Sequence, residues 1–393
     1  MPLVHMKDML AHAYEHGYAV GAFDVVSLDF VEGVMAAAER SRAPVILSLA
    51  ESHREHYDFE LLMSAVEAAA RRSSVPVAIH LDHGASLESA VRAIRLGCNG
   101  VMVDASQADF SDNLARTKVV VEMAHACGVP VEGELGYVPG VAGEDSERHP
   151  GTNAYTTVAE AKGFVERTGV DFLAVSIGTV HGRLKGKAKL DFQRLRSINQ
   201  ALGIPLAIHG GAGLDDDQFR RLIAKGVAKI NYDTALADAA GAAIRARAKS
   251  APGAGYIDLV QDVSAAISTE AERCMRVWGS AGRAAEVLSH CRPWAPVEHL
   301  IIHNVVGISE KEAAAMMAEG QQALGAIPGV REVVTGRAVK EGAQYRYCWL
   351  VRFAAPEVID SYRGHPDHVA FANRRFRPVA DRDISIDYAL EGS

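Results

Sequence analysis

The chain has 393 residues, which is longer than most single domains and predicts one large domain followed by a smaller one. Hydrophobic residues make up 49% of the sequence and the net charge is -8, a balance that indicates a globular protein and argues against nucleic acid or an anionic membrane as the main partner. The five cysteines have no Cys-x-x-Cys spacing, and neither a signal peptide nor an apolar run of about 18 residues is found, so we expect reduced thiols in a cytoplasmic protein.

Short apolar runs alternate with segments of helical periodicity from residue 19 to residue 232. The eight runs cover residues 19–23, 45–49, 77–81, 101–103, 129–131, 172–177, 206–208 and 227–230. Segments with helical spacing lie between them, for example at 30–40, 60–72 and 87–96. Eight strand–helix units predict an α/β fold in which the strands close into a parallel (β/α)8 barrel, with a doubly wound sheet as the alternative.

Polar residues with chemically active side chains follow these runs at the point where each predicted strand ends. They are Asp24, Glu51, Asp82, His83, Asp104, Glu134, His181, His209, Asn231 and Asp233. Because the carboxyl ends of all strands in such a barrel meet at one mouth, we expect these side chains to surround a common site.

Three histidines in this set, His83, His181 and His209, come from three different predicted strands. Neutral imidazoles that converge from a rigid scaffold form a zinc site with an open coordination position. Glu134 is a fourth candidate ligand, and Glu132, two residues earlier on the same strand face, could hold a ligand in place. The alternative for each histidine alone is that it ends its strand through ordinary hydrogen bonds.

Two further groups of residues would surround the metal. One is a set of carboxylates, Asp82, Asp104 and Glu144. The other could bind an anion through backbone N–H groups and polar side chains, because glycine turns after the seventh and eighth strands form the usual phosphate site of this fold. This predicted site contains Gly182, Lys185, Gly210, Gly211, Ala212, Asn231, Asp233 and Thr234.

The pattern changes after a predicted linker at residues 291–296. Segments then follow in the order strand–helix–strand–strand–helix–strand, with strands at 297–306, 330–335, 346–353 and 384–388. This order predicts a small ferredoxin-like α+β domain over residues 297–393, after a barrel domain over residues 1–290.

Several motifs of the barrel region occur together in one known family. They are His80-Leu-Asp-His-Gly84, Val131-Glu-Gly-Glu-Leu-Gly136, Ser176-Ile-Gly-Thr-Val-His-Gly182, His209-Gly-Gly211 and Lys229-Ile-Asn-Tyr-Asp-Thr234, supported by Gly21-Ala-Phe-Asp24 and Trp278-Gly-Ser-Ala-Gly282. Through these motifs the region resembles the class II, zinc-dependent fructose-bisphosphate and tagatose-bisphosphate aldolases. The resemblance implies a carbohydrate substrate and reversible aldol cleavage through a zinc-stabilised enediolate. It implies one Zn2+ per chain and allows a monovalent cation as a second cofactor.

The resemblance also implies roles for individual residues. His83, His181 and His209 would bind Zn2+, with Glu134 as an alternating or nearby ligand. Asp82 would be the acid/base at the aldehyde or hydroxyl oxygen, and Glu144 would move the proton next to the ketone. From their positions in the sequence, and not from the resemblance, we expect Asp104 and Glu132 to hold the metal ligands in place.

Two alternatives remain open from the residues themselves. A hydrolase could use the same three histidines to activate water, but it would need neither Glu144 nor the glycine anion site. A catalytically silent barrel could serve as an assembly module, but nothing in a scaffold requires Asp82 and three histidines at one rim.

The C-terminal region resembles the stress-responsive dimeric α/β-barrel domains. The resemblance is carried by Val297-Glu-His-Leu300, Ile327-Pro-Gly-Val330, Tyr362 and His365-Pro-Asp-His368. Such domains commonly pair their sheets across a dimer, which implies a homodimer or a higher homo-oligomer. Some relatives use a histidine for catalysis, so His303 or His365 could mark a second active site.

Three positions depart from the aldolase pattern near the expected substrate. Ala212 and Ala50 stand where the family usually has serine, and Asp24 replaces the family asparagine. The loss of two hydroxyl donors would cost about 1 kcal/mol each, and an ionised Asp24 would repel a dianion. We therefore predict a ketose-type substrate other than fructose 1,6-bisphosphate, with one phosphate or none.

Overall fold

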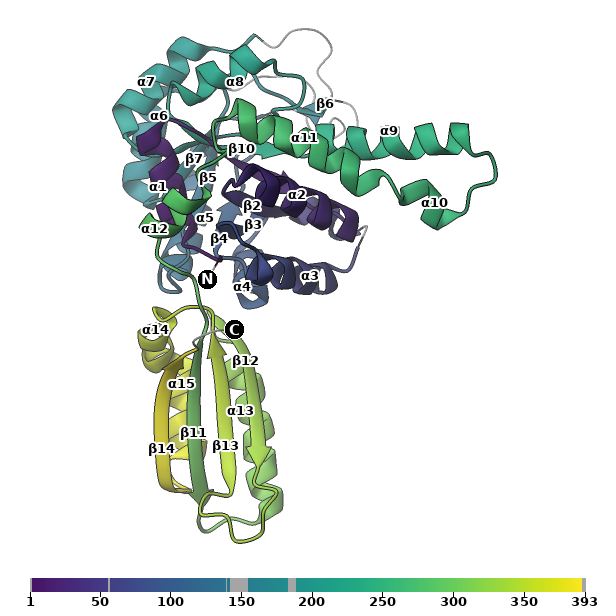
Figure 1. The fold of residues 1–393 in the computed structure, drawn as a ribbon. Helices are drawn as coiled ribbons and strands as arrows, with labels where there is room; N and C mark the ends of the chain where they lie inside the picture. The colour runs from purple at the N-terminus through teal and green to yellow at the C-terminus, as the bar shows by residue number, and fades with distance from the viewer. Residues whose placement is uncertain (1, 56, 139, 142–154, 183–188, 391–393) are drawn as a thin grey trace. The chain divides into compact units, whose positions relative to one another are not determined.

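The computed structural model of the chain describes residues 2–55, 57–138, 140–141, 155–182 and 189–390. These residues divide into two compact units, one built mainly from the chain up to Pro293 and one that contains the chain from Trp294 on. Each unit has its own sheet and its own helices, and the predicted fold class is confirmed in both (Figure 1).

The first unit is a closed barrel of parallel strands. In chain order these are β1 (Val20–Asp24), β2 (Val45–Ala50), β3 (Val77–Gly84), β4 (Gly100–Val103), β5 (Val131–Leu135), β7 (Phe172–Val175), β9 (Leu206–Ile208) and β10 (Val227–Tyr232). Because β1 pairs with both β10 and β2, the ring is closed. Strands that are covered on both faces read as continuous apolar runs, which is why the sequence shows them clearly. The (β/α)8 barrel is therefore confirmed, and the doubly wound sheet is wrong.

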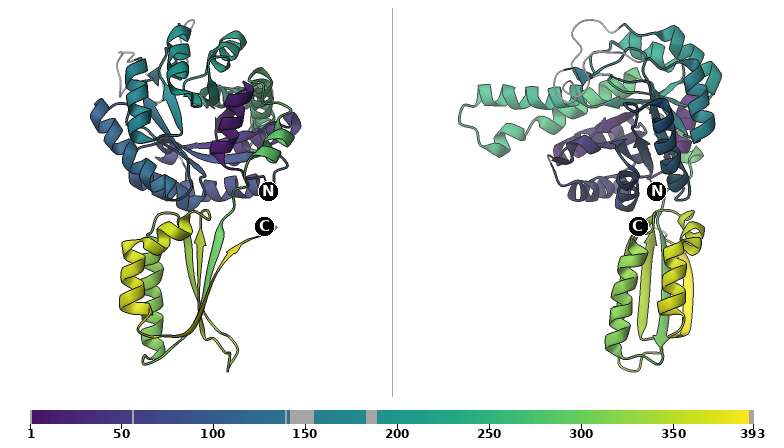
Figure 2. Two further views of the ribbon diagram at one scale, coloured as in Figure 1. Left: turned by 90° about the vertical axis from the view of Figure 1, so that its left-hand side faces the viewer. Right: turned by 180° about the vertical axis from the view of Figure 1, so that it is seen from behind.

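Helices form the outer layer of the barrel. They are α1 (Met6–His16), α2 (Leu28–Ser41), α3 (Phe59–Arg72), α4 (Leu87–Leu96), α5 (Phe110–His125), α6 (Val158–Thr168), α7 (Phe192–Leu202), α8 (Asp216–Ile223), α9 (Thr234–Ser250), α10 (Tyr256–Val260), α11 (Val263–Val277) and α12 (Ala284–His290). Asp58 and Asp215 accept hydrogen bonds from the first backbone N–H groups of α3 and α8, which explains where these helices begin. Figure 1 and Figure 2 show α9 and α11 extending together, with α10 at their tip.

Helix α1 closes the barrel at the end where the strands begin. Its buried side chains, among them Met6 and Met9, pack against residues at the starts of the strands, including Val20 and Phe172. The opposite end of the barrel, where the strands end, is not covered by α1 and contains the candidate site.

Two strands differ from the prediction in a way that affects this site. β3 continues through Asp82 and His83. β5 begins at Val131, so the fifth strand is present but the predicted bounds 129–131 are wrong. The apolar run ends at Val131 because the charged Glu132 interrupts it, although the strand continues. In the structure Glu132 and Glu134 are buried members of β5, and polar groups inside the barrel surround them.

The second unit is an antiparallel sheet with helices on one face. Its elements are β11 (Val297–Val305), α13 (Glu310–Gly325), β12 (Val330–Arg337), β13 (Tyr347–Phe353), α14 (Val358–Gly364), α15 (Pro366–Phe371), a π-helical turn (Ala372–Phe376) and β14 (Ala380–Ala389). The sheet order β12-β13-β11-β14 is that of a ferredoxin-like domain, so this prediction is confirmed. Across the described ranges of both units, no helix combines the length and the apolar character needed to span a bilayer.

Candidate active site

The last residues of β3 place two neighbouring polar side chains at the mouth of the barrel. Successive residues of a strand normally point to opposite faces. However, the pairing of β3 with β4 shifts between Leu81 and Gly84, and His83 has a φ of 46°, in the left-handed region that few non-glycine residues adopt. This irregularity lets Asp82 and His83 both line one pocket, and backbone strain of this kind is typical of functional sites.

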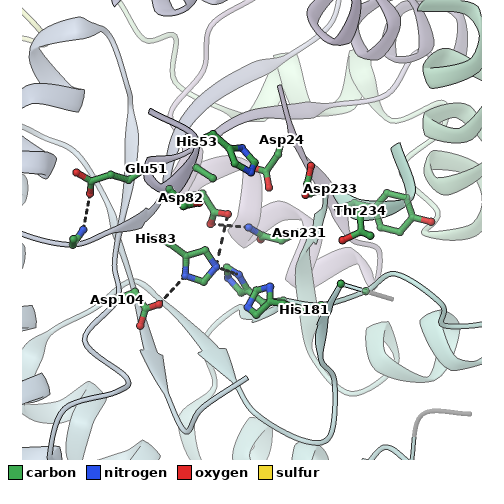
Figure 3. Close-up of a pocket in the computed structure, with 18 of the residues that line it drawn as sticks. Asp24, Glu51, His53, Asp82, His83, Asp104, His181, Asn231, Asp233 and Thr234 are labelled. Carbon is green, nitrogen blue, oxygen red and sulfur yellow. Dashed lines mark hydrogen bonds and ion pairs between the residues drawn. The ribbon is translucent and has the colours of Figure 1, made fainter. Parts of the chain in front are cut away.

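His83, His181 and His209 meet at this mouth. Figure 3 shows His83 beside His181. His181 begins the short strand β8 (His181–Gly182), which pairs with β6 (Gly140–Val141), and His209 directly follows β9. One nitrogen of each ring lies within 4.8 Å of the others, and His83 Nε2 is 3.1 Å from His209 Nδ1. The structure therefore brings the three predicted metal ligands together.

Carboxylates hold the outer nitrogens of two of these rings. His83 Nδ1 donates to Asp104 at 2.8 Å, and His209 Nε2 donates to Glu132 at 2.9 Å. In neutral rings the inner nitrogens then carry lone pairs that face one another, and a cation would relieve their repulsion. Three imidazoles that bring one nitrogen each close together, two of them oriented by carboxylates, fit zinc.

The electrostatics of the site also favour a positive charge at this point. Burial alone would lower the pKa of His83, but the carboxylates of Asp82 and Asp104 outweigh it and raise the pKa well above its usual value. Burial keeps the pKa of His209 well below its usual value, which favours a neutral ring. A proton on His83 Nε2 could be donated to His209 Nδ1 and so satisfy two rings, whereas a metal ion would engage all three.

Glu134 lies beside the three-histidine group without joining it. Its Oε2 atom is 4.0 Å from His83 Nδ1, on the Asp104 side of the ring. This oxygen is buried and has no hydrogen-bond partner among the described residues, and burial raises the pKa of Glu134 well above its usual value. The structure thus places Glu134 close to the histidines but in a second group with His83 and Asp104.

Asp82 is buried and is oriented by Asn231. The side-chain amide of Asn231 donates to Asp82 Oδ1 at 2.8 Å, and Asp82 Oδ2 lies 3.9 Å from His83 Nε2. Burial would raise the pKa of Asp82, but the nearby His83, His209 and Lys229 lower it below its usual value. The carboxylate is therefore ionised and able to accept a proton.

A pocket of about 640 Å³ opens over these residues. Its lining includes every described residue of the predicted anion site, namely Gly182, Gly210, Gly211, Ala212, Asn231, Asp233 and Thr234. Gly210 has a φ of 70°, and a side chain there would collide with the backbone of Val180, so this turn requires glycine. Glu144 and Lys185, two further predicted site residues, lie outside the described residues.

Asp24 lines the same pocket, near His53 and Asp233 (Figure 3). Burial and the carboxylates of Asp82 and Asp233 raise the pKa of Asp24 well above its usual value. These surroundings favour the protonated acid over the ionised form expected from the sequence. A neutral Asp24 keeps the donor and acceptor capacity of the asparagine that it replaces.

A buried layer of polar side chains lies beneath the mouth and was missed by the sequence analysis. Lys229 Nζ is 2.9 Å from Glu132 Oε2 and also donates to Asn231, and His80 lies 3.7 Å from the same carboxylate. His80 comes two residues before Asp82, and Lys229 comes two residues before Asn231. Since side chains of a strand repeat with a period of two, this spacing is the signal that could have found them.

The two histidines considered for a second active site have structural partners. His303 Nε2 accepts a hydrogen bond from Trp349 at 3.1 Å, and its Nδ1 donates to the carbonyl of Asn304 at 3.1 Å. His365 Nδ1 accepts from the backbone N–H of Asp367 at 3.3 Å and caps α15. The structure therefore gives both side chains roles in packing and capping.

Comparison with known proteins agrees with this geometry. Residues 4–283 match the family described as fructose-bisphosphate aldolase class-II, and residues 297–390 match the stress responsive A/B barrel domain. The chain is 44% identical over 237 residues to the probable fructose-bisphosphate aldolase of Bacillus subtilis, which covers 60% of this chain and 82% of that relative. It is 42% identical over 248 residues to the fructose-bisphosphate aldolase of Staphylococcus aureus, which covers 62% of this chain and 86% of that relative.

Solved structures show the same barrel. The YdjI aldolase from Escherichia coli K12 matches with a TM-score of 0.64 and 34% identity, over 72% of this chain and 99% of that one. A putative fructose-1,6-biphosphate aldolase from Coccidioides immitis matches with a TM-score of 0.66 and 30% identity, over 72% of this chain and 98% of that one. Fold and site together define a carbon–carbon lyase of the aldolase type.

The chain belongs to the class II fructose-bisphosphate aldolase family, whose members are typically metal-dependent. It carries a stress-responsive A/B barrel domain at its C-terminal end. Family membership decides for the aldolase over the hydrolase and the silent assembly module. A carbohydrate substrate is consistent with this family.

Proposed function

We propose that the chain catalyses metal-dependent, reversible aldol cleavage of a ketose-type substrate other than fructose 1,6-bisphosphate. The observation that carries this proposal is the position of His83, His181 and His209 beside the ionised Asp82, in one pocket of an aldolase-family barrel. We propose one Zn2+ per chain for this site, held by the three histidines, with Glu134 as the nearby further ligand.

The chain's own residues then divide the proton transfers. A bound divalent metal would supply a Lewis acid toward the ketone-side oxygens of the substrate. Asp82 accepts the proton of the hydroxyl group that becomes the aldehyde, and it returns this proton when the bond forms again. Asn231 keeps the carboxylate in place through the 2.8 Å hydrogen bond. We propose Glu144 as the base at the carbon next to the ketone.

The arrangement of Lys229 argues against a Schiff-base route. A lysine nucleophile must be neutral and must face the substrate. Lys229 is fully buried, pairs with Glu132 at 2.9 Å and donates to Asn231. In the part of the chain that the structure describes, no lysine lines the pocket.

The charges of the pocket support a substrate with fewer phosphates than fructose 1,6-bisphosphate. Arg116 is the only arginine or lysine among the described lining residues, and its guanidinium already donates to Asp112 at 2.6 Å. Besides Asp24, whose raised pKa favours the neutral acid, the lining contains the carboxyl groups of Glu51, Asp82, Asp104 and Asp233. Two phosphate groups would meet more like charge than opposite charge here, which disfavours their binding.

We expect kcat/KM for a ketose monophosphate or a free ketose to exceed that for fructose 1,6-bisphosphate. The measurement is steady-state cleavage of the three substrates by the zinc-loaded protein, with both fragments quantified. As a matched control, Ala212→Ser restores the family hydroxyl and should improve the bisphosphate about fivefold relative to the free ketose, for a hydrogen bond of about 1 kcal/mol. A wild-type preference for the bisphosphate of about a hundredfold, or roughly 2.7 kcal/mol, would contradict the proposal.

We also propose that the C-terminal sheet joins two chains. Val334, Leu350, Leu300 and Ile386 form an apolar row across its strands, and Ile302 and Ile384 lie in the adjacent row. The opposite face contributes Trp349 and Val351 to the buried core, whereas Val334, Ile384 and Ile386 are exposed. An exposed apolar face of this kind is typical of an interface.

Changing Ile386 to Glu in the full chain should therefore reduce the number of chains per particle by half. The reason is that an ionised carboxylate cannot be buried between two apolar sheets without a large cost. Sedimentation velocity measures the outcome, and Val339→Glu, at a fully exposed position away from the face, is the control. Equal particle masses for Ile386→Glu and the wild type would count against the sheet interface.

A further inference from the structure

A second group of side chains that could hold a metal lies on α1 and α12, at the end of the barrel where the strands begin. The two helices pack beside each other, and Figure 1 labels both. His12 and His16 are one turn apart on α1, and Glu286 and His290 are one turn apart on α12. Side chains one turn apart point to the same side of a helix. One ligand atom from each of His12, His16 and Glu286 lies within 4.8 Å of the other two.

The three histidine rings of this group use their Nδ1 atoms in hydrogen bonds, so their Nε2 atoms are the candidate metal ligands. His16 Nδ1 donates to the carbonyl of His12 at 2.8 Å, and His290 Nδ1 donates to the carbonyl of Glu286 at 2.8 Å. His12 Nδ1 shares a hydrogen bond of 2.9 Å with the hydroxyl of Tyr18. A hydrogen bond at one ring nitrogen fixes the tautomer and leaves the other nitrogen as a ligand, as is usual in metal sites.

The Nε2 atom of His12 is a buried polar atom that lacks a hydrogen-bond partner among the described residues. A neutral histidine offers a lone pair at this nitrogen, which is the form that a metal ligand takes. The rings of His12 and His16 stack with centroids 4.0 Å apart, an arrangement that two positively charged rings would resist.

Glu286 supplies a charged oxygen that is already oriented. Its Oε2 atom accepts from Arg283 at 2.8 Å, which leaves Oε1 at 3.7 Å from His12 Nε2 and 3.8 Å from His16 Nε2. These distances are too long for hydrogen bonds. They are close to the spacing of roughly 3.3 Å between ligand atoms around a tetrahedral zinc ion.

We propose that His12, His16 and Glu286 form a second divalent-metal site, of the zinc class, that is separate from the active site. The ring of His290 has its centroid 5.2 Å from that of His12 and is available as a fourth ligand. The site joins the first helix of the barrel unit to its last helix. A metal that bridges two segments so far apart in the chain closes a long loop and stabilises the folded barrel.

Metal counting in full-length variants tests this site. His16→Ala and Glu286→Gln are suitable because both side chains are about one-third exposed, at 38% and 35%. His125→Ala removes an exposed histidine at the end of α5 and serves as the control. After chelation, reloading with Zn2+ and gel filtration in metal-free buffer, elemental analysis should find one equivalent fewer in the two site variants than in the wild type and the control. Equal metal content in all four proteins would overturn the proposal.

A second measurement separates this site from the active site. In a His209→Ala background, where the proposed catalytic metal is lost, Zn2+ should still raise Tm, because a ligand that binds the folded state stabilises it. Adding His16→Ala should remove this rise, and adding His125→Ala should leave it in place. A Zn2+-dependent rise in Tm that persists with His16→Ala would contradict the second site, whatever the outcome at His209.

Discussion

Replacing Asp82 with Asn should lower kcat/KM for aldol cleavage by about a hundredfold or more, while the metal content stays that of the wild type. Asparagine keeps the shape of the side chain and can still pair with Asn231, but it cannot accept the hydroxyl proton. Proton transfer by a positioned side chain typically accelerates the chemical step by a factor of about a hundred to ten thousand. Since Asp82 Oδ2 lies 3.9 Å from His83 Nε2, the carboxylate is close enough to the histidines to act there without being one of them.

The measurement combines cleavage kinetics with elemental analysis of the same samples. Asp217→Asn makes the same chemical change at a side chain that is 74% exposed and should behave as the wild type. A second assay follows exchange of the ketone-fragment proton with solvent, the step proposed for Glu144, which Asp82→Asn should affect less than cleavage. If Asp82→Asn cleaves at a rate within about fivefold of the wild type, Asp82 is not the proton acceptor.

Replacing Lys229 with Met should destabilise the barrel by about 3–5 kcal/mol, because the carboxylate of Glu132 would remain buried without its cation. Lys229 and Glu132 are both fully buried, and their charged atoms are 2.9 Å apart. Methionine fills a similar volume, so the loss would arise from the charge and not from a cavity. Urea unfolding of the metal-free protein measures the effect without a contribution from metal binding.

The double variant Lys229→Met with Glu132→Gln gives the matched control. It removes both charges together, so its free energy of unfolding should lie well above that expected from adding the two single losses. A cost below about 1 kcal/mol for Lys229→Met, or strict additivity of the two changes, would show that the buried pair does not have the role assigned to it.

The barrel could be predicted because its strands are apolar on both faces and are separated by helical periodicity. The mouth could be predicted because parallel strands place their ends together. Asp82, His83, His181 and His209 were found in this way, although strand β3 itself continues further than its apolar run. The left-handed φ of His83 has no signature in the residue types, because it depends on how β3 pairs with β4.

The buried polar layer escaped prediction for a different reason. Glu132 and Lys229 are tolerable inside a barrel because their opposite charges pair across strands that are distant in sequence, and His80 lies beside this pair. A single strand does not reveal such partners. The same limit applies to Asp24, whose pKa is raised by burial and by Asp82 and Asp233, which are distant from it in sequence. It also applies to the pairing of α1 with α12.

The central claim is that three histidines hold the metal on which aldol cleavage depends. The most direct measurement compares zinc content and cleavage in the wild type and in the variant with His83, His181 and His209 all changed to Ala. The account predicts that the variant loses one equivalent of zinc and all measurable cleavage, and that added Zn2+ restores cleavage to the chelator-treated wild type alone. Zinc content equal to that of the wild type in the triple variant, or cleavage that survives in it, would contradict the account.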